Sequence, residues 1–162
     1  MGLIDRILVR EGGVADVGDG QGITRWGQTP AWLQTFGLPV PHTAADAAAN
    51  YTRWLTLTGL WHLITPDDSL ADVVVDWAVH SGHKNVIRAL QRALGVTPDA
   101  WIGPQTRVAL TAAPRRPLAG AVLADRMEFV GKLITRRPSD SRYAYGWLRR
   151  LAAQVRTLSL EI

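Results

Sequence analysis

Apolar residues recur along this chain of 162 residues at the three- and four-residue spacing of amphipathic helices. No segment alternates apolar and polar residues for long enough to predict a regular strand. Capping residues, prolines and glycines separate the apolar stripes and mark where helices begin and end. The stripes lie at residues 3–8, 30–36, 44–55, 70–78, 86–94, 104–112, 123–134 and 147–158. We therefore expect a mainly α protein of about seven or eight helices.

The connections between the stripes are short. Residues 13–22 are rich in glycine, so they predict a shaped loop or a small hairpin after the first helix. No connection is long enough to separate two independent domains, and no internal repeat is present. We expect one domain over 1–162, in which 1–66 carry the catalytic motif and 67–162 form a helical region packed against them.

Composition excludes several classes of protein. With 47% hydrophobic and 20% charged residues, the chain can build a core and does not resemble a disordered protein. The absence of cysteine excludes disulfides and thiolate metal sites. No run reaches the roughly 18 apolar residues of a membrane span. The first apolar stretch is also too short and too charged for a signal peptide. We expect a soluble domain that is made in the cytoplasm without an export signal.

Charge is unevenly distributed along the chain. Residues 1–82 carry four basic and nine acidic side chains (net −5), and residues 83–162 carry fourteen and five (net +9). The second half should be attracted to polyanions, which include nucleic acid, anionic membranes and charged cell-wall polymers. Charge alone does not choose among them. Of the basic clusters, we expect Arg137 and the pair Arg149 and Arg150 to lie on solvated faces.

Glu11 is an unusual residue for its position in the first predicted helix. It follows Leu8 by three residues and Ile7 by four, which places a carboxyl group on the apolar stripe. It also lies in the last turn, where the helix dipole disfavours a negative charge. We expect both effects to raise its pKa and to make it suitable as a general acid. The alternative is that the helix frays at Gly12 and that Glu11 reaches water.

The glycine-rich loop can bring a second carboxyl group opposite Glu11. Asp19 is the leading candidate and Asp16 the alternate. Two carboxyl groups across a cleft are the equipment for glycosidic cleavage, in which one protonates the leaving oxygen and the other activates water or attacks the sugar. Thr24, just after the loop, is a candidate to position the water or the substrate.

The residues at 11–13 and 22–24 resemble the E-G-G…G-I-T signature of the glycoside hydrolase family 108 N-acetylmuramidases, which occur among phage endolysins and secretion-associated bacterial muramidases. The second half is similar to the peptidoglycan-binding-type region of those proteins. The matching segments there lie at residues 76–79, 90–96, 99–106, 137–138 and 146–150. The segments follow one another in the expected order over nearly the whole chain.

The resemblance implies a lysozyme-like helical fold and hydrolysis of the β-1,4 bond between N-acetylmuramic acid and N-acetylglucosamine, with Glu11 as the acid. It also implies bacterial peptidoglycan as the partner. The chain departs from the family pattern at Val14, where the family usually has Tyr, and at His80, where Asn is common. Its loop between the two motifs is also shorter, which leaves the identity of the second carboxylate open.

Aromatic and polar side chains supply candidate substrate contacts. Trp26 and Trp32 follow the loop, and an aromatic face can stack on the C–H surface of a sugar ring. Tyr51, His80 and Gln91 complete the candidate substrate-binding set together with Asp16. For Tyr51 core packing remains an alternative, and for Gln91 the alternative is an amide that satisfies buried backbone groups.

For the other five tryptophans, the sequence predicts only whether they lie in the core or in a connection. Trp54, Trp77 and Trp147 lie on apolar stripes, so we expect them in the core. Trp61 and Trp101 lie in connections, where packing and sugar contact are equally open.

We expect no metal and no organic cofactor. His80 and His83 lack the spacing of two ligands on one helical face, and side chains alone suffice for glycoside hydrolysis. We expect a monomer that acts on peptidoglycan, with transient contact to anionic membranes or wall polymers and no nucleic-acid partner.

The setting we expect is a phage endolysin that reaches the periplasm or the wall through a separate pore. A non-catalytic wall-binding or secretion-accessory protein on the same scaffold is the alternative function.

Overall fold

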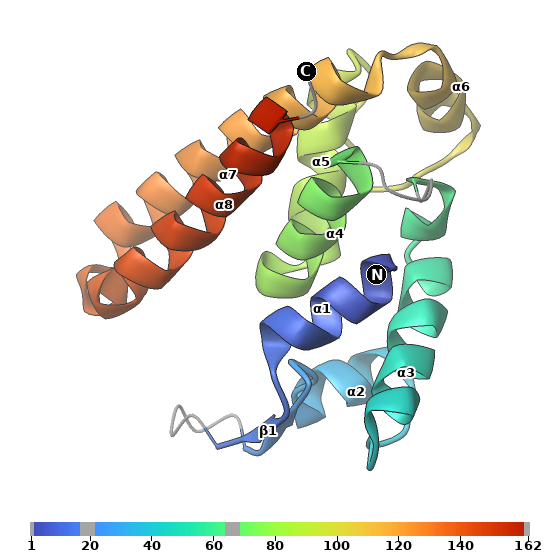
Figure 1. The fold of residues 1–162 in the computed structure, drawn as a ribbon. Coiled ribbons are helices and arrows are strands. Elements are labelled where there is room, and N and C mark those ends of the chain that lie inside the picture. Colours follow the sequence, from blue (N-terminus) through green and yellow to red (C-terminus); the bar gives the residue numbers. More distant parts are fainter. Residues whose placement is uncertain (1, 17–21, 64–68, 161–162) are drawn as a thin grey trace. The chain divides into compact units, whose positions relative to one another are not determined.

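The computed structural model describes residues 2–16, 22–63 and 69–160. It confirms a mainly helical chain, with eight α-helices in this described part (Figure 1). The helices are α1 (Leu3–Glu11), α2 (Pro30–Phe36), α3 (Ala44–Leu57), α4 (Ser69–Ser81), α5 (His83–Ala93), α6 (Pro104–Ala112), α7 (Arg115–Arg136) and α8 (Ala144–Leu160). Two 3₁₀ helices, η1 (Leu60–Leu63) and η2 (Pro138–Tyr143), precede α4 and α8.

The helices begin at the residues that the sequence marks as caps. The Thr29 hydroxyl accepts a hydrogen bond from the Trp32 backbone N–H at 3.2 Å, and Pro30 occupies the first turn of α2. At the start of α3, Thr43 and Asp46 form a capping box in which each side chain accepts from the other's backbone N–H.

Two short strands flank residues 17–21, which lie outside the described part of the chain, and their pairing agrees with the predicted small hairpin. Strands β1 (Val14–Ala15) and β2 (Thr24–Arg25) pair antiparallel, with Val14 opposite Arg25 and Ala15 opposite Thr24. The hairpin directly follows α1, so it ties the end of that helix to the residues after the loop.

Contacts along the chain divide it into two compact units, Met1–Asp67 and Asp68–Ile162. In the first unit, α1 packs on α3, and the core includes Ile7, Trp54 and Leu55. That the whole chain forms one domain stays a prediction.

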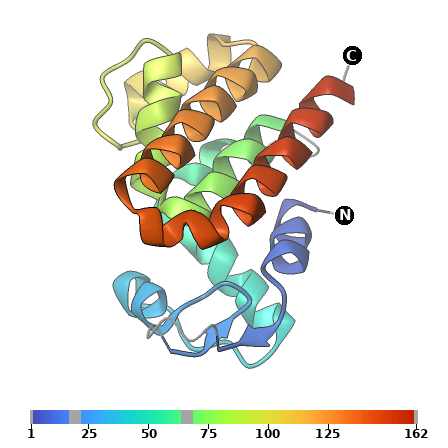
Figure 2. The same cartoon turned by 90° about the vertical axis from the view of Figure 1, so that its left-hand side faces the viewer.

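The second unit is organised around α4, which is buried at every position from 69 to 78. Helices α5, α7 and α8 pack against it, and α7 and α8 lie side by side in both views (Figure 2). Met127 lies on the predicted stripe of α7 but is 41% exposed. Its side chain lines a hollow of about 550 Å³ between α7 and α8 instead of the core. Trp77 is buried as expected, whereas Trp147 is only half-buried.

None of the helices in the described part of the chain combines the length and apolar character needed to cross a membrane.

Candidate active site

Glu11 is the last residue of α1, and its side chain is half-buried. The helix ends because Gly12 takes φ +71°, a left-handed conformation that favours glycine, while its N–H bonds to the Leu8 carbonyl. The chain then enters β1 directly. This geometry fixes the position of the Glu11 backbone from both sides.

A strained turn, residues 25–28, lies beside the end of α1. Arg25 and Gln28 exchange backbone hydrogen bonds of 2.9 and 3.2 Å, which close the turn. Between them Trp26 has φ +48° and Gly27 has φ +77°. Positive φ is costly for a tryptophan, so the surrounding contacts must hold this turn in place.

Gly27 marks the point where Glu11 and Tyr51 converge. A Cβ atom at Gly27 would lie 2.8 Å from both Cγ and Oε2 of Glu11 and 2.9 Å from the Tyr51 hydroxyl. Only a glycine lets the carboxyl group and the hydroxyl approach the turn so closely. The structure thus brings Glu11 and Tyr51 together with the turn of Trp26.

Tyr51 links this site to the aromatic core. Its hydroxyl donates a hydrogen bond of 2.7 Å to the Trp26 carbonyl, and its ring is buried. Trp32 and Trp54 pack on one another at 5.7 Å between ring centroids, and the Tyr51 ring lies 5.7 Å from Trp32 and 6.2 Å from Trp54. These tilted and edge-on contacts are the favourable geometries for aromatic rings. Tyr51 therefore has both the core-packing role that the sequence left open and a polar role at the turn.

Gln28 and Asn50 anchor the turn to α3, and sequence reasoning did not single them out. The Gln28 amide donates to the Ala47 carbonyl at 2.9 Å and accepts from Asn50 at 2.8 Å. Asn50 also donates to the Pro39 carbonyl at 2.8 Å. Both side chains are buried, so these bonds fix the position of residues 25–28 relative to α3. The sequence offers one signal for Asn50, which is that a polar residue lies next to Tyr51 on the apolar face of a predicted helix.

The other predicted residues of the first unit lie on β2, in the 25–28 turn, on α2 and directly after β1. Thr24 is half-buried on β2, Trp26 and Trp32 are half-buried, and Asp16 is exposed directly after β1. Asp19 lies outside the described residues. The roles of these residues stay predictions.

His80 and Gln91 belong to the second unit. The Gln91 side chain is 1% exposed, and its amide bonds to Asp99, Trp101 and Thr106 and to the backbone N–H of Ala100. Gln91 therefore has the structural role that was one of the two predictions for it, and contact with substrate stays a prediction.

His80 lies near the ring of Trp147, with 6.0 Å between the ring centroids. Burial and the positive charges of Arg150 and Arg126 lower the pKa of His80 to about 4, although Asp76 acts in the opposite direction. The imidazole is therefore neutral at pH 7.

The two arginines that lower the pKa of His80, Arg126 and Arg150, belong to a largely buried cluster with Asp76 and Gln154. Arg126 donates to Asp76 at 2.7 Å, and Arg150 donates to both Asp76 carboxylate oxygens at 2.8–3.0 Å. Burial would raise the pKa of Asp76, but the hydrogen bonds and charges of Arg150 and Arg126 outweigh it and lower the pKa to about 2. The expectation of a solvated face is thus wrong for Arg150, because its guanidinium pairs with a buried carboxylate. Arg137 and Arg149 are exposed.

Within residues 2–16, 22–63 and 69–160, no group of three or more His, Asp or Glu side chains is arranged to hold a metal ion.

Known proteins resemble this chain in two ways. A family model described as "Predicted Peptidoglycan domain" matches residues 85–152, which run from α5 into α8. SagA from Brucella abortus has a solved structure with a TM-score of 0.74, 24% sequence identity, and coverage of 96% of this chain and 91% of that chain. The chain shares the SagA fold. No curated protein matches the sequence significantly.

Proposed function

We propose that this chain is a peptidoglycan hydrolase of the glycoside hydrolase family 108 type. It cleaves the β-1,4 bond between N-acetylmuramic acid and N-acetylglucosamine, with Glu11 as general acid. The observation that carries the proposal is the convergence of the Glu11 carboxyl group and the Tyr51 hydroxyl on Gly27, beside the Trp26 turn. A half-buried carboxyl group on a rigid frame is what proton donation to a sugar oxygen requires.

The reaction follows from the two carboxyl groups. Glu11 in its protonated form gives its proton to the glycosidic oxygen as the bond from that oxygen to the anomeric carbon breaks. The departing sugar leaves with a hydroxyl group, and positive charge develops on the ring that remains. A second carboxylate, Asp19 or alternatively Asp16, then activates water or attacks the anomeric carbon, and Thr24 positions the water. No cofactor takes part in these steps.

Peptidoglycan is the proposed substrate for two reasons. Residues 85–152 match a family model that is described by this polymer. The net charge of +9 over residues 83–162 also favours attraction to an anionic cell wall. In the proposed setting the protein is a phage endolysin that acts as a monomer on the wall of the host.

Lysis of permeabilised cells tests the catalytic role of Glu11. Glu11→Gln keeps the shape of the side chain but removes the transferable proton, so we expect the lysis rate to fall by about 10²–10⁴-fold. The measurement is the fall in turbidity of bacteria whose outer membrane has been stripped.

Glu128→Gln is the matched control, since Glu128 forms an exposed ion pair with Lys132 on α7. This variant should lyse cells at the wild-type rate. Equal lysis by the wild type and Glu11→Gln would exclude Glu11 as the acid.

A wall-binding protein without catalytic activity is the second candidate. The family match favours it, because residues 85–152 do not include Glu11 or the hairpin. In that case the wild type and Glu11→Gln would bind purified peptidoglycan equally, and neither would lyse cells.

A further inference from the structure

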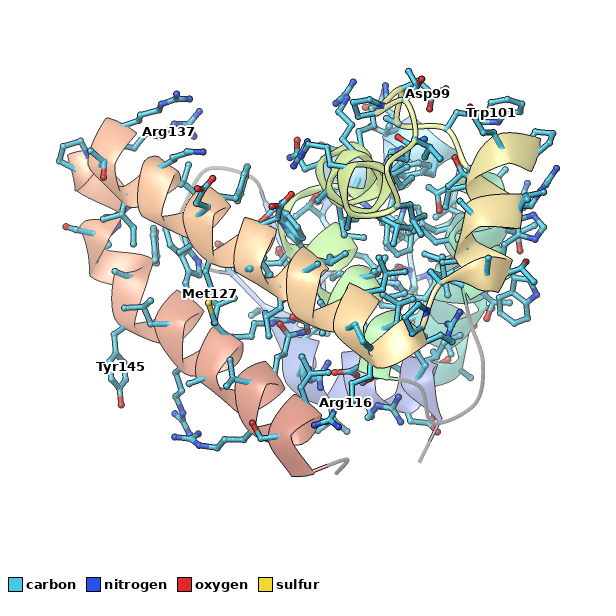
Figure 3. The ribbon with its side chains drawn as sticks, turned by 90° about the horizontal axis from the view of Figure 1, so that it is seen from above. Asp99, Trp101, Arg116, Met127, Arg137 and Tyr145 are labelled. Atoms are coloured by element: carbon cyan, nitrogen blue, oxygen red, sulfur yellow. The ribbon has the colours of Figure 1, made fainter. Side chains whose placement is uncertain are left out.

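Trp101 is an exposed aromatic side chain in the connection between α5 and α6. Its surface is 65% exposed, whereas the next residue in the chain, Ile102, is buried. An exposed indole offers a flat apolar face on which a ligand ring can stack. Figure 3 shows Trp101 and Asp99 on this connection, with both side chains pointing outward.

The buried side chain of Gln91 holds the connection in place. The Gln91 amide nitrogen donates to Asp99 Oδ1 at 2.7 Å and to the Trp101 carbonyl at 2.9 Å, and its oxygen accepts from the Ala100 N–H at 2.9 Å. One buried side chain of α5 therefore fixes three successive residues of the loop. A side chain carried by such a loop loses little further entropy when it binds a ligand.

Backbone strain and close packing set the direction of the indole. Ala100 has φ +67°, a conformation that is unfavourable for a residue with a Cβ atom. A Cβ atom at Gly103 would lie only 2.3–2.9 Å from three atoms of the Trp101 ring. The ring thus rests on the backbone at Gly103, where only glycine leaves room for it.

A carboxylate lies next to this ring in the loop. Asp99 Oδ1 accepts from the Gln91 amide and, at 2.8 Å, from the Trp101 backbone N–H. The bonds from the Trp101 N–H and the Gln91 amide, together with one from the backbone N–H of Asp99 itself, lower the pKa of Asp99, so the group is ionised at neutral pH. Asp99 is exposed, so its carboxylate can still accept a hydrogen bond from a ligand.

We propose that Trp101 and Asp99 form a carbohydrate-binding subsite for an N-acetylhexosamine ring of a glycan strand. The C–H bonds on one face of the sugar carry partial positive charge and stack on the electron-rich indole face. The exposed Asp99 carboxylate accepts a hydrogen bond from a sugar hydroxyl or from the acetamido N–H. This inference rests on the proposed function, because it names a second contact with the same polymer.

The charge of the site selects the ligand class. An ionised carboxylate beside the ring disfavours a phosphate or carboxylate group in direct contact with this loop, while the net charge of +9 over residues 83–162 still attracts an anionic wall as a whole. A neutral ring with many hydroxyl groups suits an aromatic face flanked by an acceptor.

Binding measurements with Trp101 variants test the subsite. The soluble probe is the tetramer of β-1,4-linked N-acetylglucosamine, measured by calorimetry, and the insoluble probe is purified peptidoglycan, measured by co-sedimentation. Trp101→Ala should weaken binding of both probes by about tenfold, the scale of one lost aromatic contact. Trp101→Phe keeps a flat ring and should retain most of the affinity.

Trp61→Ala is the matched control, because Trp61 is also exposed, at 47%, but lies on η1 of the first unit. It should bind both probes as the wild type does. Wild-type affinity in Trp101→Ala would overturn the subsite and leave the proposed function intact. Equal losses of affinity in the Trp61 and Trp101 variants would do the same. A wild type that does not bind peptidoglycan would overturn both.

Discussion

At the scale of single residues, the candidate site depends on a few atoms that approach the backbone at Gly27. The Glu11 carboxyl group and the Tyr51 hydroxyl both lie within 2.9 Å of the place where a Cβ atom would stand. Tyr51 is held there by its bond to the Trp26 carbonyl. The position of the proposed acid is thus set by packing against a turn as well as by its own helix.

Gly27→Ala tests this arrangement. The new methyl group would displace the Glu11 side chain, and φ +77° would cost stability of about 1–3 kcal/mol. We expect the lytic rate to fall by about a hundredfold, the usual effect of moving a catalytic group by about 1 Å.

The matched control for that substitution is Gly37→Ala. Gly37 ends α2 with φ +60°, but no atom lies within 4 Å of a Cβ placed there. It should lose similar stability in thermal unfolding and keep its lytic rate below the unfolding temperature. Similar losses of activity in both variants would show that strain alone explains the effect.

The position of Glu11 on an apolar stripe could be recognised from the sequence, but its neighbours could not. Residue spacing on a helix gives the face on which Glu11 lies. Tyr51, which approaches the Glu11 site, follows Glu11 by 40 residues in the chain. Its approach and the positive φ of Trp26 depend on tertiary contacts that no local pattern encodes.

His80 gives a second residue-scale prediction, for stability as a function of pH. Its pKa is about 4 in the fold and 6.5 for an unperturbed histidine, so the unfolded chain binds a proton at a higher pH than the folded chain does. The free energy of unfolding should therefore decrease as the pH falls from 6.5 towards 4.

His80→Asn should make that decrease smaller in urea unfolding measured at pH 7 and pH 5. An unchanged pH dependence in His80→Asn would contradict the lowered pKa.

At the scale of elements, every helix predicted from an apolar stripe is present, because periodicity and capping act over a few neighbouring residues. The two 3₁₀ helices were not predicted, since they are too short to show a period. The prediction that Arg150 lies on a solvated face was wrong, and the error has a physical cause. Its partner Asp76 is 74 residues away, so the sequence shows only a charge near the end of the chain.

The cluster around Asp76 joins α4, α7 and α8, and it should contribute strongly to stability. Asp76→Asn leaves the guanidinium of Arg126, which is 3% exposed, without its counter-charge. We expect the free energy of unfolding to fall by about 3–5 kcal/mol in denaturant titrations.

Asp125→Asn is the control for burial. Asp125 and Arg92 are also 2.7 Å apart, but their side chains are 37% and 54% exposed, so the loss should stay below about 1 kcal/mol. Equal losses in the two variants would show that burial does not decide the strength of these ion pairs.

At the scale of the whole molecule, the chain combines two units of opposite charge character. The first unit, Met1–Asp67, carries the proposed acid and has four basic and six acidic side chains, a net charge of −2. The second unit, Asp68–Ile162, carries the peptidoglycan-domain match and has fourteen basic and eight acidic side chains, a net charge of +6. In the proposed function, the first unit cleaves the glycosidic bond and the second contacts the glycan through Trp101. Charge asymmetry could be counted from the sequence, whereas the division into units required the contacts of the folded chain.

The most direct test of the central claim is mass spectrometry of purified peptidoglycan after incubation with the protein. We expect soluble fragments that end in reducing N-acetylmuramic acid, and we expect none when Glu11→Gln replaces the wild type. Fragments with anhydro ends, cleaved peptide stems, or no released fragments from the wild type would contradict it.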